Sequence, residues 1–424
     1  MAVAAHKSDG AAALLARHAR PRPLSWLEAA RDGAAMRLNA MGAPHGRDEY
    51  WRYTPPAQFL GDVAAVPHVE DAPLFAADDA YTLVFVDGVF DAAQSELGND
   101  PALRIQTLDA ANADIHWAAE SYGALETAGQ NPVPRPLAAL NTATAGQGVL
   151  IRVSGKAAKP VLLRHIRSAA NAEAMLHHVI KLDAGASLTL LEDGVIAARS
   201  NVVLEVDVAD GAAFDHIRNQ GRDHGRVLAS HIFARLGAGA LFKSFTLSLN
   251  GLLSRNEAVI TLTGDNASAH ISGAAVGDGA FLHDDTIFIT HDAEHCESRQ
   301  VFKKVLRNGA NGVFQGKILV KPGAQKTDGY QISQGLLLDD DSNFLAKPEL
   351  EIYADDVVCS HGSTCGSVDE TALFYLTSRG VPRADAQDLL VLAFLDEAIA
   401  EIGDDDLADT LRTRLGGWLA RHRK

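Results

Sequence analysis

A cysteine and a histidine stand two residues apart near the end of the chain, at Cys359 and His361. The residues before them are strand-like, and side chains at positions i and i+2 of a strand share a face, about 6.5–7 Å apart at the backbone. A thiolate and an imidazole so placed can hold a soft metal ion or a sulfur species between them. Two ligands do not close a site, so the pattern indicates a site that a second chain completes. The same residues are also consistent with a structural role, in which a half-buried cysteine lies beside a hydrogen-bonded histidine and neither binds a ligand.

A second group of possible ligands consists of His291, His295 and Cys296. On a helix, the two histidines would share a face, as paired zinc ligands do. The preceding residues 286–290 are strand-like, however, and a strand would hold the histidines about 13 Å apart. The sequence therefore favours structural or surface histidines here over a metal site.

Composition and motifs argue against several classes of function. The 54 acidic and 38 basic residues give a formal charge of −16, which argues against non-specific binding of nucleic acid or acidic lipid. No run of about 18 apolar residues occurs, so we expect no membrane span. Three cysteines and the lack of a secretory signal favour a reduced compartment, the cytoplasm. The chain also lacks a P-loop motif, so we expect it to bind no ATP itself.

Short alternating segments dominate the chain from about residue 147 to 358. Turns follow them in which Gly185, Gly211, Gly239 and Gly264 recur with a period in the mid-twenties. Such a repeat of strand and turn favours a β-solenoid, in which each coil buries its inward face on its neighbours. A β-sandwich would also give short strands with regular turns, but the sustained period favours the solenoid.

Helical patterns flank the repeats on both sides. Residues 25–42 have the pattern of a helix whose capping box pairs Ser25 with Glu28. After Gly366, Asp369 is placed to cap another helix. We therefore expect a mainly β protein in three parts. The expected parts are an α-rich N-terminal region over residues 1–130, a β-helix core over 131–366 and a C-terminal helical domain over 367–424.

The sequence around the cysteine–histidine pair resembles a known family. Residues 347–366 and 369–380 are similar to the SufD branch of the SufB/SufD family of iron–sulfur cluster assembly proteins, and Cys359-Ser-His-Gly362 is the most specific stretch. Residues 47–54, 85–90 and 140–143 agree as well. Cys365 departs from the family, whose members usually carry an aliphatic residue there, and we interpret it as incidental.

The resemblance implies a right-handed parallel β-helix and a complex with two partners. SufB would pair with this chain through the β-helix, and the SufC ATPase would bind the C-terminal helical domain. A homodimer is possible when the chain is alone. The surface expected to dock SufC comprises Leu373, Phe374, Tyr375, Leu376, Arg379 and Gly380.

The resemblance also implies that His361 contributes to cluster assembly or iron handling, with Cys359 beside it in a less certain role. The cargo would be a transient iron–sulfur cluster or iron shared with the partner subunit. The expected function is that of a non-enzymatic scaffold. Two alternatives are a carbohydrate-active β-helix enzyme and a purely structural homo-oligomer. The enzyme is disfavoured because such lyases and hydrolases are commonly secreted and because the acids of this chain sit mostly at turns.

Overall fold

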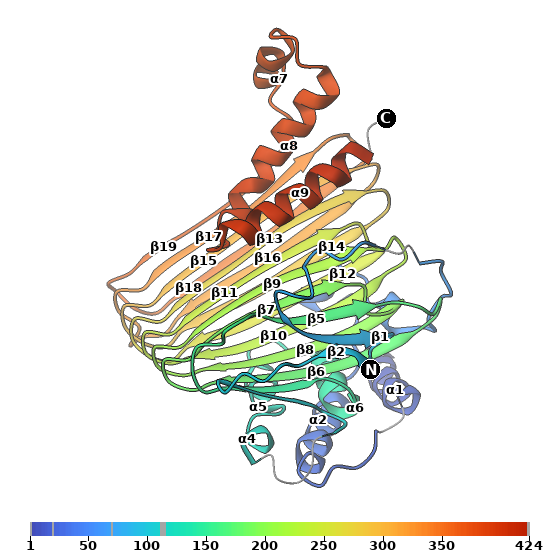
Figure 1. Cartoon of the computed structure of the whole chain (residues 1–424), viewed down its shortest axis with the longest axis vertical. Helices are drawn as coiled ribbons and strands as arrows, with labels where there is room; N and C mark the ends of the chain where they lie inside the picture. The colour runs from blue at the N-terminus through green and yellow to red at the C-terminus, as the bar shows by residue number, and fades with distance from the viewer. Residues whose placement is uncertain (1, 19–20, 69–70, 111–115, 422–424) are drawn as a thin grey trace.

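Two long β-sheets form the centre of the molecule in the computed structural model (Figure 1). The structure describes residues 2–18, 21–68, 71–110 and 116–421. Within these ranges, sheet A contains, in spatial order, β19 (Val358–Gly366), β17 (Asp328–Leu337), β15 (Glu297–Arg307), β13 (Ser268–Asp278), β11 (Leu241–Leu249), β9 (Ala213–Arg222), β7 (Ser187–Gly194), β5 (Val161–Ile166), β1 (Tyr81–Val86) and β2 (Val89–Glu96). Sheet B contains β18 (Asn343–Ile352), β16 (Asn311–Val320), β14 (Leu282–His291), β12 (Leu253–Leu262), β10 (Val227–Leu236), β8 (Arg199–Val208), β6 (Glu173–Leu182), β4 (Val149–Val153) and β3 (Leu103–Thr107).

From β4 to β19 the chain crosses from one sheet to the other, and each coil pairs in parallel with the coil before it. In sheet B, Val227 pairs with Leu253, and Asn311 pairs with Asn343. These partners mark coils of 26 and 32 residues, close to the period expected from the sequence. The predicted mainly β solenoid is therefore confirmed.

A ladder of left-handed turns stacks along one edge of the solenoid. Each turn residue has a positive φ and donates its backbone N–H to a carbonyl oxygen of the next coil. The turn residues are Gly185, Gly211, Gly239, Asn266, His295 and Lys326. Gly264, which the sequence analysis placed in this series, lies two residues before the true position, Asn266.

Apolar side chains fill the space between the sheets. Phe214 and Phe242 stack in successive coils of sheet A, and Phe302 packs against Phe314 of sheet B. Each is almost fully buried, and burying one such side chain stabilises the fold by about 1.5–3 kcal/mol. Because side chains alternate along a strand, the same strands direct every second residue to the outer faces.

The N-terminal helices cover the outer face of sheet B. They are α1 (Ala2–Arg17), α2 (Glu28–Met41), the 3-10 turn η1 (Glu49–Trp51), α3 (Ala57–Leu60), α4 (His116–Ala119), α5 (Ala124–Ala128) and α6 (Pro136–Thr144). Leu14 and Leu38 of these helices pack with Val227 and Leu253 of the sheet. Leu27 stands at the N-cap of α2 without a side-chain cap, so the predicted capping role of Ser25 is wrong.

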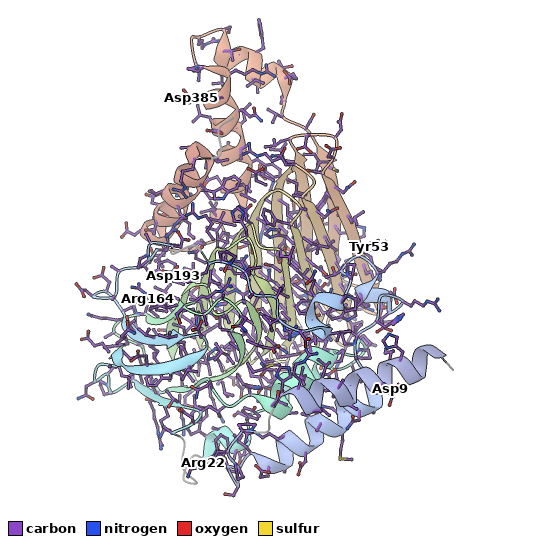
Figure 2. The ribbon with its side chains drawn as sticks, turned by 90° about the vertical axis from the view of Figure 1, so that its right-hand side faces the viewer. Asp9, Arg22, Tyr53, Arg164, Asp193 and Asp385 are labelled. Atoms are coloured by element: carbon purple, nitrogen blue, oxygen red, sulfur yellow. The ribbon has the colours of Figure 1, made fainter. Side chains whose placement is uncertain are left out.

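The C-terminal helices cover the outer face of sheet A. They are α7 (Glu370–Thr377), α8 (Arg383–Ile399) and α9 (Asp405–Arg421). Leu395 and Trp418 pack with Phe245 and Val305 of the sheet, whereas α7 contacts α8 and lies beyond the sheets (Figure 1). Asp369 accepts hydrogen bonds from two backbone N–H groups of α7, which confirms its predicted cap. Figure 2 shows Asp385 of α8 far from Asp9 of α1.

Strands β1, β2 and β3 precede residue 131 and nevertheless belong to the two sheets. β1 pairs in parallel with β5, whereas β2 and β3 run antiparallel to their neighbours β1 and β4. The division of the chain at residues 131 and 367 stays a prediction, and its last part includes residues 422–424, which lie outside the described ranges. None of the described helices is long and apolar enough to cross a membrane.

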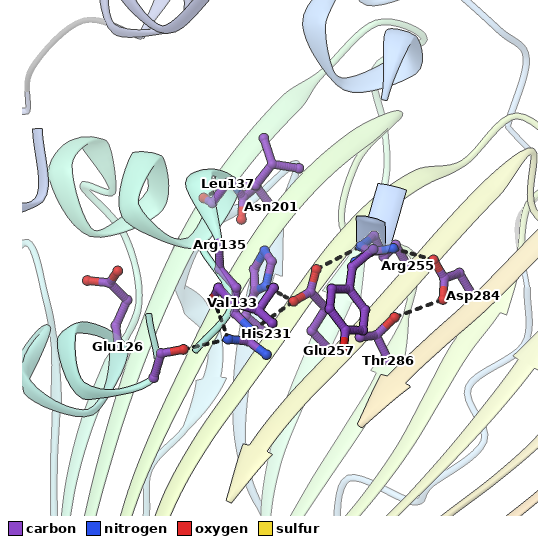
Figure 3. A network of polar contacts seen from close by, with 12 residues as sticks. Glu126, Val133, Arg135, Leu137, Asn201, His231, Arg255, Glu257, Asp284 and Thr286 are labelled. Atoms are coloured by element: carbon purple, nitrogen blue, oxygen red, sulfur yellow. Dashed lines mark hydrogen bonds and ion pairs between the residues drawn. The ribbon is translucent and has the colours of Figure 1, made fainter. Parts of the chain in front are cut away.

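A buried ionic network attaches the N-terminal region to sheet B (Figure 3). Glu257 lies 3.0 Å from Arg135 and 2.7 Å from Arg255, and Arg255 also pairs with Asp284. Thr54 donates a hydrogen bond to Asp284. Burial opposes ionisation of Glu257, but its cationic neighbours prevail and lower its pKa to about 2. The network therefore remains charged at neutral pH.

Candidate functional site

Cys359 and His361 lie on β19, the last strand of sheet A. Their partners across the ladder are Gly329 and Gln331 of β17, and no strand of the described chain pairs with the other edge of β19. The two residues therefore stand at the end of the solenoid, beside the first position that a further coil would occupy.

Both side chains are on the inner side of the sheet. A methyl group built on Gly329 would lie 3.2 Å from Sγ of Cys359 and 3.5 Å from Ile318, which belongs to the interior apolar cluster. Two positions beyond His361, the hydroxyl of Ser363 is hydrogen-bonded to that of Ser333 at 2.8 Å. Because alternate residues share a face, His361 lies on this inner side between them.

The facing edge belongs to β18 of sheet B. Its even-numbered residues face the interior of the solenoid, because they pair with the inward-facing residues of β16. Ile318 pairs with Leu350, and Val320 pairs with Ile352. The residues of this set are Phe344, Ala346, Pro348, Leu350 and Ile352. We call the space between β18 and β19 the mouth of the solenoid. One wall is largely apolar, and the other carries Cys359, His361, Ser363 and Cys365.

The thiol and the imidazole differ in their surroundings. His361 is exposed, whereas Cys359 is half-buried against the interior apolar cluster. Burial raises the pKa of the Cys359 thiol; the negative charge of Asp328 adds to this, and a backbone hydrogen bond from Gly329 opposes it. The thiol is therefore protonated at neutral pH, and a metal ion that binds it must displace the proton.

The other two cysteines have different settings. Cys365 is exposed on the same strand as Cys359, at the far end of β19, and both are free thiols. Cys296 is buried at a turn, where its Sγ lies 3.3 Å from the carbonyl oxygen of Gly264. Burial raises the pKa of Cys296 as well. Cys296 is therefore a structural thiol immediately before β15, two coils behind β19.

The second group of possible ligands is dispersed by the fold. His291 is buried at the end of β14 and is hydrogen-bonded to the hydroxyl of Ser298 at 2.8 Å, whereas His295 occupies the left-handed turn ladder and is exposed. Within the described ranges, no three histidine, cysteine or carboxylate side chains gather closely enough to hold a metal ion. The mouth carries three such groups along β19, Cys359, His361 and Cys365, and the two that stand two residues apart, Cys359 and His361, fit part of an iron site.

Sequence reasoning missed two glutamines behind His361. Gln331 pairs with His361, and Gln300 pairs with Gln331 one coil deeper. Both side chains are fully buried, and among the described residues none of their amide atoms has a hydrogen-bond partner. The available signal was a polar residue at an inward position of two successive strands.

A cavity of about 310 Å³ lies elsewhere, between sheet A and the turn from α8 to α9. Asp215, Lys243 and His270 line it from the sheet. The ring of His270 lies 3.4 Å from Glu401 of the turn and 3.5 Å from Glu297. These contacts attach the turn to sheet A, and the cysteine–histidine pair does not line this cavity.

The surface predicted to dock an ATPase lies on α7 and the turn after it. Phe374 is 72% exposed and Tyr375 is 55% exposed, with the guanidinium of Arg379 over the Tyr375 ring at 3.5 Å. Leu373 is buried, and Leu376 is half-buried. Two large aromatic side chains therefore stand in solvent on a helix that lies beyond the sheets.

Comparison with known proteins agrees with this architecture. The family model described as "SUF system FeS cluster assembly, SufBD core domain" matches residues 165–394. The iron–sulfur cluster assembly protein SufD of Escherichia coli is 30% identical over 398 residues, which cover 90% of each chain. A SufBD family protein of Synechocystis is 29% identical over 412 residues, 90% of this chain and 89% of the relative. The SufD protein of Bacillus subtilis is 24% identical over 277 residues, 63% of each chain.

The matched segment contains the solenoid strands from β6 onward, the mouth with Cys359 and His361, and most of α8. The relative from Escherichia coli extends the similarity to nine-tenths of the chain. The chain therefore belongs to the SufB/SufD family of the Suf iron–sulfur cluster assembly system.

Proposed function

We propose that this chain is a non-catalytic scaffold subunit that pairs with SufB through the mouth of its solenoid and contributes His361 and Cys359 to the junction where clusters form. The observation that carries the proposal is the mouth itself. Two edge strands, β18 and β19, end the solenoid without a neighbour in the described chain, and both candidate ligands face inward there.

The open end of a solenoid is expected to bind a partner. Solenoids need polar capping repeats for solubility, and unpaired strand edges are templates for pairing with another chain. Here β18, the residue after it and β19 expose large apolar side chains instead, namely Leu345, Ile352, Tyr353 and Val358. A second solenoid stacked on this end buries those groups and brings further ligands to the mouth.

The cargo of such a junction is iron or a nascent iron–sulfur cluster. Neutral imidazole suits ferrous iron, and a thiolate suits cluster iron or sulfane sulfur. Because this chain offers only part of a ligand set, separation of the subunits exposes the product and allows its release. The three free thiols fit a reducing compartment, the cytoplasm.

The ATPase subunit SufC docks on the other functional element, α7. Phe374 and Tyr375 supply the aromatic anchors that interfaces favour, and Arg379 lies at their edge. Helices α8 and α9 connect this surface to sheet A. ATP chemistry therefore resides on the partner, and this chain transmits the resulting movement to the solenoid.

Co-purification of this chain with SufB and SufC tests the pairing. Val358 is 70% exposed on β19, and Val89 is 57% exposed on β2, at the other end of the same sheet. We expect Val358→Asp to weaken SufB binding by at least about tenfold, because Val358 lies on the edge strand β19, outside the mouth, and a carboxylate there loses water to a partner strand that pairs with this edge. We expect Val89→Asp, the matched control, to bind SufB normally.

Normal SufB binding by Val358→Asp, or equal loss in both variants, would overturn the assignment of the mouth as the junction. The same end also fits a second copy of this chain when SufB is absent. In that case the wild-type chain alone elutes as a dimer, and Val358→Asp shifts it to a monomer. A chain that forms only this homodimer and never retains SufB would favour the purely structural homo-oligomer.

A further inference from the structure

Three polar side chains stack in successive coils behind the mouth. Gln300 of β15, Gln331 of β17 and His361 of β19 occupy one inward column of sheet A. Neighbouring strands lie about 4.8 Å apart, so each side chain is the nearest neighbour of the next. His361 is thus the exposed end of a buried carboxamide column.

The carboxamide of Gln331 reaches across the interior to sheet B. A methyl group built on Gly316 would lie 2.5 Å from its Oε1 and 2.7 Å from its Nε2, so only a glycine leaves room for the amide there. Gly316 pairs with Pro348 of β18. The amide therefore forms the floor of the mouth, between the wall that carries His361 and the wall that carries Pro348.

The side-chain amide of Gln331 has N–H donors and an acceptor oxygen that form no hydrogen bond with any other described residue. The side chain is fully buried, and neither Oε1 nor Nε2 has a hydrogen-bond partner within the described ranges. A buried polar group without a partner is destabilising compared with an apolar side chain of the same shape. A leucine would bury no unpartnered amide at this position, so stability alone does not account for a glutamine.

We propose that Gln331 is the positioning residue of His361. When a partner covers the mouth, the Gln331 Oε1 accepts the N–H of one imidazole nitrogen of His361. The other nitrogen then presents its lone pair to ferrous or cluster iron at the junction. Ligating histidines commonly donate their second N–H in this way, which fixes both tautomer and ring orientation. The inference rests on the proposed function, because it assumes that His361 is a ligand.

The test measures Co²⁺ binding to the reconstituted complex by visible absorption, with Co²⁺ alone as the probe. We expect Gln331→Leu to lower the affinity about tenfold, the lower end of the range for loss of such a partner. Gln331→Glu keeps an acceptor oxygen and should retain at least the wild-type affinity. Gln300→Leu, the matched change one coil deeper, should leave the affinity unchanged.

A second readout separates positioning from folding. We expect the melting temperature of Gln331→Leu to equal or exceed that of the wild type, because the change removes an unpartnered buried amide. A Gln331→Leu variant that melts lower and binds Co²⁺ normally would show a structural role and overturn the proposal.

His361→Ala distinguishes failure of this proposal from failure of the proposed function. If His361→Ala weakens Co²⁺ binding and Gln331→Leu does not, only the positioning role is wrong. If His361→Ala also binds Co²⁺ as the wild type does, His361 is not a ligand, and both inferences fail.

Discussion

At the scale of single residues, the candidate ligands are unequal at neutral pH. The pKa of Cys359 is raised by burial, so its sulfur carries a proton that must leave before a metal binds. His361 is exposed, and an imidazole offers a lone pair without such a cost when neutral. If the proposed function holds, the imidazole would be the better first ligand for ferrous iron, and the thiol would bind once a metal had displaced its proton.

The buried histidines should make the free energy of unfolding depend on pH. Burial lowers the pKa of His231 to about 4 and that of His178 to about 3, from an ordinary value of 6.5. A group with a lowered pKa in the folded state stabilises the fold above its unfolded pKa and loses that contribution as pH falls. We expect the free energy of unfolding to decrease between pH 6.5 and 4, by about 3 kcal/mol for His231.

Urea denaturation at pH 7, 5.5 and 4.5 measures this slope. His231→Gln cannot take up a proton and should show a flatter pH dependence than the wild type. His295→Asn, at an exposed turn, is the control and should retain the full slope. A His231→Gln slope as steep as the wild-type slope would contradict the pKa assignment.

The sequence predicted that the two candidate ligands share a face, but it did not predict the residues behind them. The spacing of Cys359 and His361 followed from the two-residue alternation of a strand, which needs no knowledge of neighbours. Gln300 and Gln331 lie one coil apart, and their stacking depends on the register between strands. That register is set by the lengths of the turns, which local sequence patterns do not specify.

At the scale of elements, the repeat period was predictable and the identity of the turn residues was not. Glycine marked the left-handed position in three coils, at Gly185, Gly211 and Gly239. Later coils place Asn266, His295 and Lys326 there. Asparagine accepts this conformation readily, and the backbone ladder between coils holds the other two in it. Glycine as the sole marker of the turn therefore points to Gly264 instead of Asn266, two residues later.

The prediction at the scale of elements concerns the binding of SufC to helix α7. We expect Phe374→Glu to weaken SufC binding by about 2 kcal/mol or more, because it replaces an exposed aromatic anchor with a charge. Met36 of α2 is also 72% exposed, as Phe374 is, and Met36→Glu serves as the matched control. Calorimetric titration of each purified variant with SufC measures the difference. Equal affinities for the two variants would refute α7 as the docking element.

At the scale of the whole molecule, the two ends of the solenoid are different. The N-terminal end finishes in β2 and β3, which run antiparallel to their neighbours and interrupt the parallel stacking. The C-terminal end finishes in β18 and β19, which are parallel to their neighbours. The space between these two strands, the mouth, has no further coil of the described chain over it. The parallel stacking can therefore be continued by a second solenoid at the C-terminal end, which carries the candidate ligands.

This asymmetry was only partly predictable from the sequence. The helical flanks and the repeats were visible as patterns, and the incomplete ligand set at Cys359 and His361 already indicated a shared site. The sequence did not indicate that β2 and β3 run antiparallel at the other end, because the direction in which a strand pairs is a property of the assembled sheet. The open end becomes evident only when both edges are compared.

Cluster formation on the anaerobically reconstituted complex of this chain with SufB and SufC tests the central claim most directly. The iron and sulfide contents would be measured for the wild type, for His361→Ala, and for Ser360→Ala, an exposed neighbour on the opposite side of β19. We predict that all three complexes assemble and that the cluster yield falls about tenfold in His361→Ala alone. A wild-type yield from an intact His361→Ala complex would contradict the account.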